Sequence, residues 1–417
     1  FFLEGANQFE FGLGLGEAFI PFFTRRVGLL EGQQIPINGG VKLNGRVGRW
    51  NLGILDVQTR ETTLAPGTNL FAGRVSYDLT NKFRVGTILT HGDPAGLRQN
   101  TLVGFDAVWR TSTFRDNKNL LIGGWTAFSA GDIPQGQRAG WGFKIDYPND
   151  LVDCYTTINE FGEALDPALG FLPRPGTRQY QGGCSYKPRP AKTGSFGWIR
   201  QYFLRNYYAR VDNSRGTNES WKYTFTPLEI ELDSGELLAF TWEPQYELLP
   251  APFEIVQGLF IPPGPYRINR WRFAAQTSHH RRWRFETENG FGTFYSGHLL
   301  QWLNRVNWTS PKGAWQVGLE ATNNFTRLRE GNFVQRLWQL EFSRAWGPNV
   351  VLTSFIQYDT ESQNIGANTR LRWTIKPGRD LFLVWNRGWE HLLNRPDLTL
   401  RPDSEFLAVK LRWTFRE

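Results

Sequence analysis

The chain has 417 residues, a formal net charge of +8, 44 glycines and 15% aromatic residues. Its mean hydropathy is −0.43, and no stretch approaches the roughly 20 consecutive apolar residues that a membrane-spanning helix needs, so a helical membrane protein is excluded. Two cysteines in so long a chain do not make a disulfide scaffold. A modest positive charge without a basic helix or a stacking platform argues against nucleic acid as a partner.

The first 38 residues differ in residue pattern from the rest of the chain. They are rich in phenylalanine and alternate poorly between apolar and polar side chains, which is unlike a strand. We therefore expect residues 1–38 to pass through the lumen of a barrel or to add one strand to it, with the interior course favoured, and residues 39–417 to form the barrel. The chain starts at Phe1 and contains no methionine, which we interpret as a mature or trimmed piece of a longer protein.

From Val41 onward, segments of roughly ten residues alternate apolar and polar side chains and end in turn residues, as strands that cross an outer membrane do. The sequence therefore predicts an all-β protein, an antiparallel up-and-down transmembrane β-barrel of about 20 strands (roughly 18 to 22). The expected strands are 41–47, 50–60, 69–79, 82–92, 99–112, 117–130, 137–148, 151–162, 177–188, 195–210, 217–232, 236–249, 265–278, 280–292, 296–309, 313–324, 332–345, 348–360, 365–376, 379–390 and 404–415.

The spacers between these strands are alternately short and long. Thr80-Asn81, Asp233-Ser234-Gly235 and Lys376-Pro377-Gly378 are turn sequences. The longer spacers are 61–68, 162–177, 249–265, 325–331 and 390–404. Outer-membrane barrels have short periplasmic turns and longer outer loops. The alternation thus predicts a bacterial outer-membrane location, in contact with outer-membrane lipid and lipopolysaccharide.

The two cysteines are expected to be neighbours across adjacent strands. Cys154 follows the turn near 148–150 and Cys184 precedes the turn near 188–194, so both should lie at a similar depth. Their parity places both on the outward face. The periplasm permits a disulfide; the alternative is two small apolar residues without a bond.

The spacer at 250–265 is too apolar for a loop exposed to water. About 20 strands spaced ~4.8 Å apart and tilted ~40° enclose a bore on the order of 40 Å, which would leave the cell permeable unless something filled it. The spacer and segment 1–38 are the candidates for filling it. An exposed patch would instead mark a partner-binding surface, and the residues concerned are Phe253, Ile255, Leu259, Phe260 and Ile261.

The polar faces of the strands carry charge as well as hydroxyl groups, and burying many arginines in a dry core would be very costly. This face is therefore expected to line an aqueous lumen, through Arg282, Arg284, Glu286, Gln316, Glu320, Arg370, Arg372, Lys410 and Arg412. The arginines either form an anion-attracting wall or are neutralised by Glu286, Glu320, Glu341 and Asp359; both interpretations stay open.

The last expected strand, Phe406 to Phe415, alternates most regularly. Leu407, Val409, Leu411 and Trp413 share one face, while Lys410 and Arg412 share the other. Tryptophan and tyrosine also recur near the strand ends, where the aromatic girdles of a membrane barrel lie.

Several motifs resemble a known family. They are Phe1-Phe2-Leu3-Glu4-Gly5, Phe22-Phe23-Thr24-Arg25-Arg26-Val27-Gly28, Gly40-Val41-Lys42-Leu43-Asn44-Gly45-Arg46 with Asn51-Leu52-Gly53, and Gly170-Phe171-Leu172-Pro173-Arg174. Together they resemble the uncharacterised barrel domain that follows a carbohydrate-binding, family-9-like domain in bacterial surface proteins. The resemblance implies an outer-membrane location and a link to saccharides, although this chain lacks the N-terminal binding domain. It supplies no catalytic residues.

The sequence contains no phosphate-binding loop, paired-cysteine zinc motif or nucleophile elbow, so no catalytic, cofactor or metal residues are predicted. His279-His280 is expected to lie in a solvated turn. The predicted function is a gated or partly plugged pore for solutes, saccharides among them. The alternatives are a surface-anchoring or assembly component that docks surface or periplasmic proteins, and a hydrolase at the barrel rim.

Overall fold

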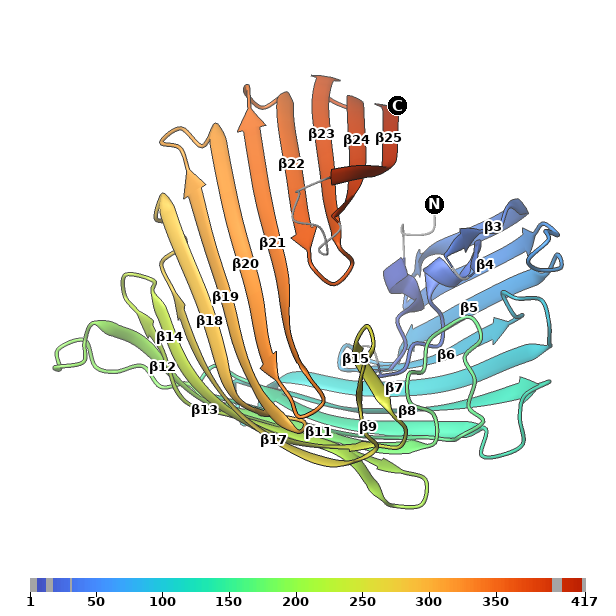
Figure 1. Ribbon diagram of the computed structural model, residues 1–417. Helices are drawn as coiled ribbons and strands as arrows, with labels where there is room; N and C mark the ends of the chain where they lie inside the picture. The colour runs from blue at the N-terminus through green and yellow to red at the C-terminus, as the bar shows by residue number, and fades with distance from the viewer. Residues whose placement is uncertain (1–5, 13–17, 31, 392–399, 415–417) are drawn as a thin grey trace. The chain divides into compact units, whose positions relative to one another are not determined.

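The structure, a computed structural model, describes residues 6–12, 18–30, 32–391 and 400–414. Within these residues, 21 strands form one antiparallel barrel sheet in chain order, β3 to β14 followed by β17 to β25 (Figure 1). Two small hairpins, β1–β2 and β15–β16, lie outside this sheet. The protein is therefore all-β, with the antiparallel up-and-down barrel fold that the sequence predicts. No helix in the described ranges is long and apolar enough to span a membrane.

The elements have the following bounds: η1 Ala6–Phe9, η3 Thr24–Arg26, β1 Leu29–Leu30, β2 Gln33–Gln34, β3 Ile37–Val47, β4 Trp50–Thr59, β5 Asn69–Asp78, β6 Phe83–His91, β7 Asn100–Phe114, β8 Lys118–Gly131, β9 Ala139–Pro148, β10 Val152–Phe161, β11 Thr177–Tyr186, β12 Ile199–Asn213, β13 Asn218–Leu232, β14 Leu237–Leu249, β15 Phe253–Val256, β16 Leu259–Ile261, β17 Gly264–Gln276, β18 Trp283–Phe294, β19 Gly297–Thr309, β20 Trp315–Arg327, β21 Asn332–Ala345, β22 Val350–Asp359, β23 Asn364–Lys376, β24 Arg379–His391 and β25 Leu400–Trp413.

The chain forms two compact units. Unit 1 comprises Phe1–Tyr186 and Asn206–Lys222, and unit 2 comprises Lys187–Arg205 and Tyr223–Glu417. Strands β12 and β13 therefore contribute to both units. Each unit is described by itself below.

The expected strand boundaries differ from the observed ones by up to four residues, and two of the differences change the picture of the sheet. Strand β3 begins at Ile37, which pairs with Thr59, so it includes the end of the segment expected to precede the barrel. Because Gly39 and Gly40 have no side chains, this part of the strand shows no alternation of apolar and polar residues, and the sequence pattern does not reveal it. The spacer expected at 325–331 is shorter, because β20 continues to Arg327 and leaves only a tight turn before β21. Phe415, the expected end of the last strand, lies outside the described residues.

In both units one face of the sheet is apolar and uncovered. In unit 1, Phe105, Phe128 and Trp141 are exposed on this face although they are large and apolar. In unit 2 the corresponding side chains run along β20 from Trp315 to Phe325. At ~3.4 Å per residue and a tilt of ~40°, these roughly ten residues rise about 25 Å, the height of the apolar band of an outer-membrane barrel. Uncovered apolar area of this extent requires a non-aqueous surrounding.

Aromatic rings mark one edge of the apolar band in unit 2. Near the strand ends that carry the turns 277–282, 310–314, 346–349 and 377–378, this band includes Trp283, Trp308, Trp315, Trp373 and Trp413. We refer to these strand ends as the turn rim. An aromatic belt at this position is typical of a membrane–water interface.

The two cysteines are direct cross-strand partners. Cys154 on β10 pairs with Cys184 on β11, their Cα atoms are 4.1 Å apart, and the two sulfurs form a disulfide. Cys154 also pairs with Tyr147 of β9, so both cysteines lie on the apolar face of unit 1. The position agrees with the parity and the depth inferred from the sequence.

Replacing both cysteines (C154S/C184S) is expected to lower the free energy of unfolding by about 2–4 kcal/mol, because the bridge constrains the unfolded chain. The urea concentration at which half of the protein is unfolded measures this. The folded form is recognised on gels because its migration changes when the sample is heated. Thr156→Ser, on the same face of β10, is the matched control. An unchanged midpoint in the double variant would contradict the assigned role of the bridge.

Candidate functional site

The N-terminal segment covers the face of the unit 1 sheet that lies opposite the uncovered apolar face (Figure 1). Phe9, Phe11, Phe19 and Phe22 are all at most 6% exposed. They pack against buried side chains of β4 to β10 and of the loop that follows β10, namely Leu55, Val57, Leu70, Ala72, Ile88, Leu102, Trp125, Ala127, Phe161, Leu165 and Leu169. The described residues of the segment that precede β3 thus cover this face of unit 1 and add no strand to the barrel sheet.

Stacked rings form the centre of this contact. The rings of Phe19 and Trp125 are stacked with centroids 4.9 Å apart, and Trp125 is stacked on Phe161 at 5.8 Å. Phe11 meets Trp125 edge-on at 6.1 Å. Gly104 lies beneath Phe11, and a Cβ there would be 2.7 Å from the Phe11 ring. Such a close approach requires glycine at this position.

An ion pair anchors the middle of the segment. Arg74 Nη1 and Nη2 donate to Asp106 Oδ1 and Oδ2 at 2.6 and 2.8 Å, and both side chains are nearly buried, at 6% and 11% exposed. Arg74 Nε also donates to the carbonyl oxygen of Glu10 at 3.0 Å, and the amide of Gly12 donates to Asp106 Oδ2 at 3.2 Å. The pair therefore satisfies backbone groups of the segment as well as its own charges.

The loop between β10 and β11 holds the other end of the segment. Ile20 and Phe171 exchange backbone hydrogen bonds of 2.9 and 2.7 Å, and the amide of Phe23 donates to Leu169 O at 2.8 Å. Arg26 Nε donates to Gly170 O at 3.2 Å. A Cβ at Gly170 would lie 1.8 Å from Ile20 O, so the two backbones can approach only because this residue is glycine. Two of the sequence motifs quoted above thus contact each other.

Asp106→Ala is expected to loosen the segment. The change leaves Arg74 buried without its counter-charge, which costs about 3–5 kcal/mol and should accelerate protease cleavage of the N-terminal segment by roughly 100-fold or more. Cleavage rates from timed digestion measure this. Asp56→Ala is the control, because Asp56 accepts from Asn69 on the opposite face. Equal rates in the two variants would show that the ion pair does not hold the segment.

The polar face of unit 2 carries two ion-pair ladders. Arg272 on β17 donates to Glu243 on β14 at 3.1 Å and to Glu288 on β18 at 2.9 Å. Arg305 on β19 donates to Glu286 on β18 at 2.8 Å and pairs with Glu320 on β20. These six residues of the ladders are joined by the strand register, which brings each arginine between two carboxylates.

The register places the predicted lining residues on this same polar face. Arg284 pairs with Asn307, Glu286 with Arg305, and Gln316 with Ser343. Arg372 and Lys410 both face Phe382, and Arg412 faces Asp380. Arg282 lies in the turn before β18. The sequence-based prediction did not include Arg272 and Arg305. Each could have been identified as an arginine that lies at about the same depth as glutamates on both neighbouring strands.

Four cations on β23 and β25 form an uncompensated group, which we call the basic wall: Arg370, Arg372, Lys410 and Arg412. Each is exposed, and none forms an ion pair within the described part of the chain. Arg370 lies over the Phe382 ring at 4.6 Å. The one carboxylate paired with them across the strands, Asp380, accepts a hydrogen bond from Thr374 at 2.6 Å.

None of the acidic residues expected to neutralise the lining, Glu286, Glu320, Glu341 and Asp359, forms an ion pair with the basic wall within the described residues. Glu286 and Glu320 compensate Arg305. The Asp359 carboxylate accepts hydrogen bonds from the Glu361 amide at 2.9 Å and the Ser362 hydroxyl at 3.0 Å. The structure thus contains both situations that the sequence left open, arginines compensated by glutamates on β14–β20 and a positive wall on β23–β25.

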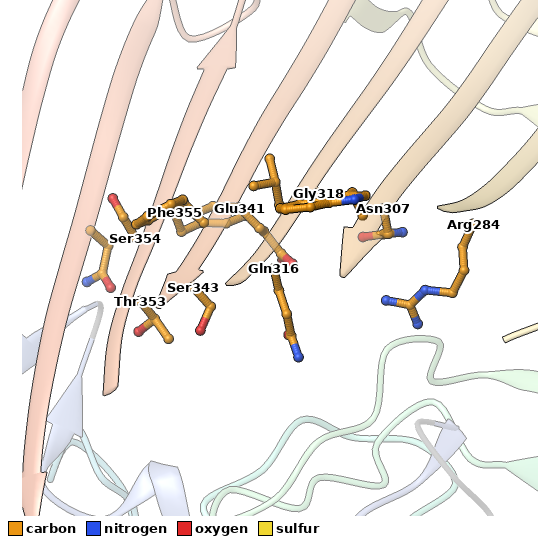
Figure 2. A pocket seen from close by; sticks show the side chains of 13 residues that line it. Arg284, Asn307, Gln316, Gly318, Glu341, Ser343, Thr353, Ser354 and Phe355 are labelled. Atoms are coloured by element: carbon orange, nitrogen blue, oxygen red, sulfur yellow. The ribbon is translucent and has the colours of Figure 1, made fainter. Parts of the chain in front are cut away.

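A hollow of about 380 Å³ lies on β18 to β23 of unit 2. Figure 2 shows Arg284, Gln316, Ser343 and Thr353 extending to the same side of these strands, with Asn307, Glu341 and Phe355 among them. The lining includes amides, hydroxyls, the charged groups of Arg284 and Glu341 and the ring of Phe355, which suit hydrogen bonding to a polar solute together with contact to its apolar edge. Among the described residues, no group of three or more His, Cys, Asp or Glu side chains could hold a metal ion.

The apolar spacer after β14 folds as the hairpin β15–β16 and is only partly buried. Ile261 is fully buried, and Ile255 and Leu259 pack beside it against the rim residues Leu249, Leu328, Tyr266, Phe294, Tyr295 and Phe333. Phe253 and Phe260, by contrast, are 43% and 51% exposed. Burial, followed by a hydrogen bond to Glu247, raises the pKa of Tyr295 in the turn beneath the hairpin. The predicted set therefore divides into a buried and an exposed half.

Comparisons with known proteins give structural similarity without sequence similarity. No family model matches the sequence, and no curated protein matches it. Among solved structures, a mutant of the ferric enterobactin receptor from Pseudomonas aeruginosa is similar, with a TM-score of 0.49 and 9% sequence identity over 87% of this chain and 72% of the receptor chain. At this TM-score the similarity carries no argument, and the fold assignment rests on the strand pairing described above.

Proposed function

We propose that this chain is a transport barrel of the bacterial outer membrane whose lumen is narrowed by its own N-terminal segment. The single observation that carries the proposal is the packing of that segment against unit 1. Stacked rings and the Arg74–Asp106 pair hold it on the face opposite the apolar band. A barrel of this strand number would enclose a bore on the order of 40 Å if nothing filled it.

The polar face of unit 2 supplies the remaining pathway in this proposal. Each ladder holds one arginine and two glutamates, a net charge of −1, while the basic wall together with Asp380 carries +3, so small polar anions are favoured over cations along the wall. Saccharides as the solute class are supported by the family resemblance and by the amide and hydroxyl groups around Phe355. Saccharides that carry a carboxylate or a phosphate fit both features.

Single-channel recording on the purified protein in planar bilayers tests this function. Stepwise conductance that is small for a barrel of this size, with anions more permeant than cations, is expected. A folded, inserted barrel that never conducts would exclude transport.

The exposed phenylalanines of the hairpin favour a second candidate, a docking role for surface or periplasmic proteins. Phe253 and Phe260 present apolar area on the hairpin, which packs on the strand ends opposite the turn rim, and such a patch is typical of a partner-binding surface. Loss of a co-purifying partner in Phe253→Ser/Phe260→Ser, in a barrel that does not conduct, would support this candidate in place of transport.

A further inference from the structure

Arg344 is an uncompensated cation on the apolar face of unit 2. It lies on β21 next to the turn rim and pairs across the strands with Trp315 of β20 and Leu352 of β22. Trp315 belongs to the aromatic belt and is 40% exposed. The side chain therefore lies at the depth where this face would meet the membrane interface.

Two tryptophan rings hold the guanidinium. Its Cζ lies 4.1 Å from the centroid of Trp315 and 5.6 Å from that of Trp346, which is 56% exposed in the adjoining turn. Stacking on both rings orients the planar group and leaves its edge free to donate.

The guanidinium has no protein partner. Its Nε is buried and makes no hydrogen bond, and no ion pair or hydrogen bond to its other nitrogens exists within the described ranges. The register places no acidic residue on the same face of β20, β21 or β22. A charge next to an apolar surround is costly unless it is paired.

The same arrangement recurs on a nearby strand. Arg379 at the start of β24 pairs with Trp413 of β25 and stacks over its ring at 3.8 Å. Arg379 likewise forms no ion pair within the described part of the chain. Two stacked arginines at the same rim indicate a built feature of this edge of the membrane band.

We propose that Arg344, held between Trp315 and Trp346, binds the phosphate of an anionic phospholipid in the leaflet at the turn rim. The guanidinium edge matches two phosphate oxygens, the tryptophan rings contact the glycerol and upper acyl region, and the anionic headgroup supplies the missing counter-charge. Short turns mark the periplasmic rim of such barrels, and the periplasmic leaflet is where phospholipid is expected. The inference rests on the membrane placement in the proposed function but not on conduction.

Native mass spectrometry of the detergent-solubilised full chain tests the site, with phosphatidylglycerol as the probe. Arg344→Gln is expected to weaken the most tightly held lipid adduct at least about 10-fold, and Arg344→Lys, which keeps the charge but loses the planar fork, to weaken it less. Lys312→Gln removes a positive charge from a turn of the same rim without adjacent stacking and should stay within about 2-fold of the wild type. Heat-modifiable migration on gels shows that each variant is folded.

Three outcomes would overturn the proposal. Equal adducts in Arg344→Gln and the wild type would remove Arg344 from lipid binding. Equal retention of phosphatidylcholine would show that the charge of the headgroup is not recognised, and displacement by inorganic phosphate or lipopolysaccharide at matched concentration would assign another source of phosphate. A chain that does not partition into membranes at all would instead refute the proposed function.

Discussion

Deleting residues 1–27 is expected to raise the single-channel conductance several-fold. The deletion removes the buried phenylalanines of the segment but ends before β3, which starts at Ile37, so all 21 strands of the sheet remain. Conductance follows the cross-section of the pathway, and the segment packs on side chains of β4 to β8 and β10 that face the lumen in the proposed barrel. Recording in planar bilayers at fixed salt measures the effect.

A covalent lock provides the control for this experiment. An ideal Cβ at Gly53 lies 3.3 Å from the Cβ of Gln8, close to the separation that a disulfide requires. Gln8→Cys/Gly53→Cys, in the C154S/C184S background, should pin the segment when oxidised and release it when reduced. Combined with Asp106→Ala, which frees the segment, the oxidised lock should return the conductance to the wild-type level.

The lock also covers the case in which the deletion fails to fold. Removing the segment exposes apolar side chains such as Leu55 and Trp125 to water, whereas the locked and unlocked forms of one protein share the same composition. If neither the deletion nor reduction of the lock in the Asp106→Ala variant changes the conductance of a folded barrel, the segment does not obstruct the pathway.

Reversing the basic wall is expected to reverse ion selectivity. Arg370, Arg372, Lys410 and Arg412 contribute +4, and Asp380 contributes −1, so the wall has a net charge of +3. Replacing the four cations with glutamate gives −5. Because these side chains are exposed to the pathway, the sign of the local potential should decide which ion is enriched.

The reversal potential across a salt gradient measures this selectivity. At ~0.1 M salt the Debye length is about 10 Å, so the wall acts over much of a narrowed pathway, and the effect should fade as salt rises. Lys312→Glu, in an exposed turn, is the control and should leave the sign unchanged. If the fourfold variant conducts but the sign of its reversal potential is unchanged, the role of the wall is refuted and transport is not.

The sequence by itself determined most of the fold. Alternation with a period of two and turn sequences such as Lys376-Pro377-Gly378 are local signals, so strand existence and facing could be read from the chain. The face of Lys410 and Arg412 and the shared depth of Cys154 and Cys184 followed from parity and distance to a turn. Where alternation lacks side chains, as at Gly39 and Gly40, the boundary was missed.

Only the tertiary structure decided what the charged and aromatic residues do. Whether Glu286 compensates Arg284 or Arg305 depends on strand register, which shifts every partner if it moves by one residue. The contacts of Ile20 with Phe171 and of Glu10 with Arg74 join residues far apart in the chain, and no local pattern encodes them. The position of the N-terminal segment and the separation of the ion-pair ladders from the basic wall arise from pairing over long sequence distances, which the fold imposes and the local sequence does not.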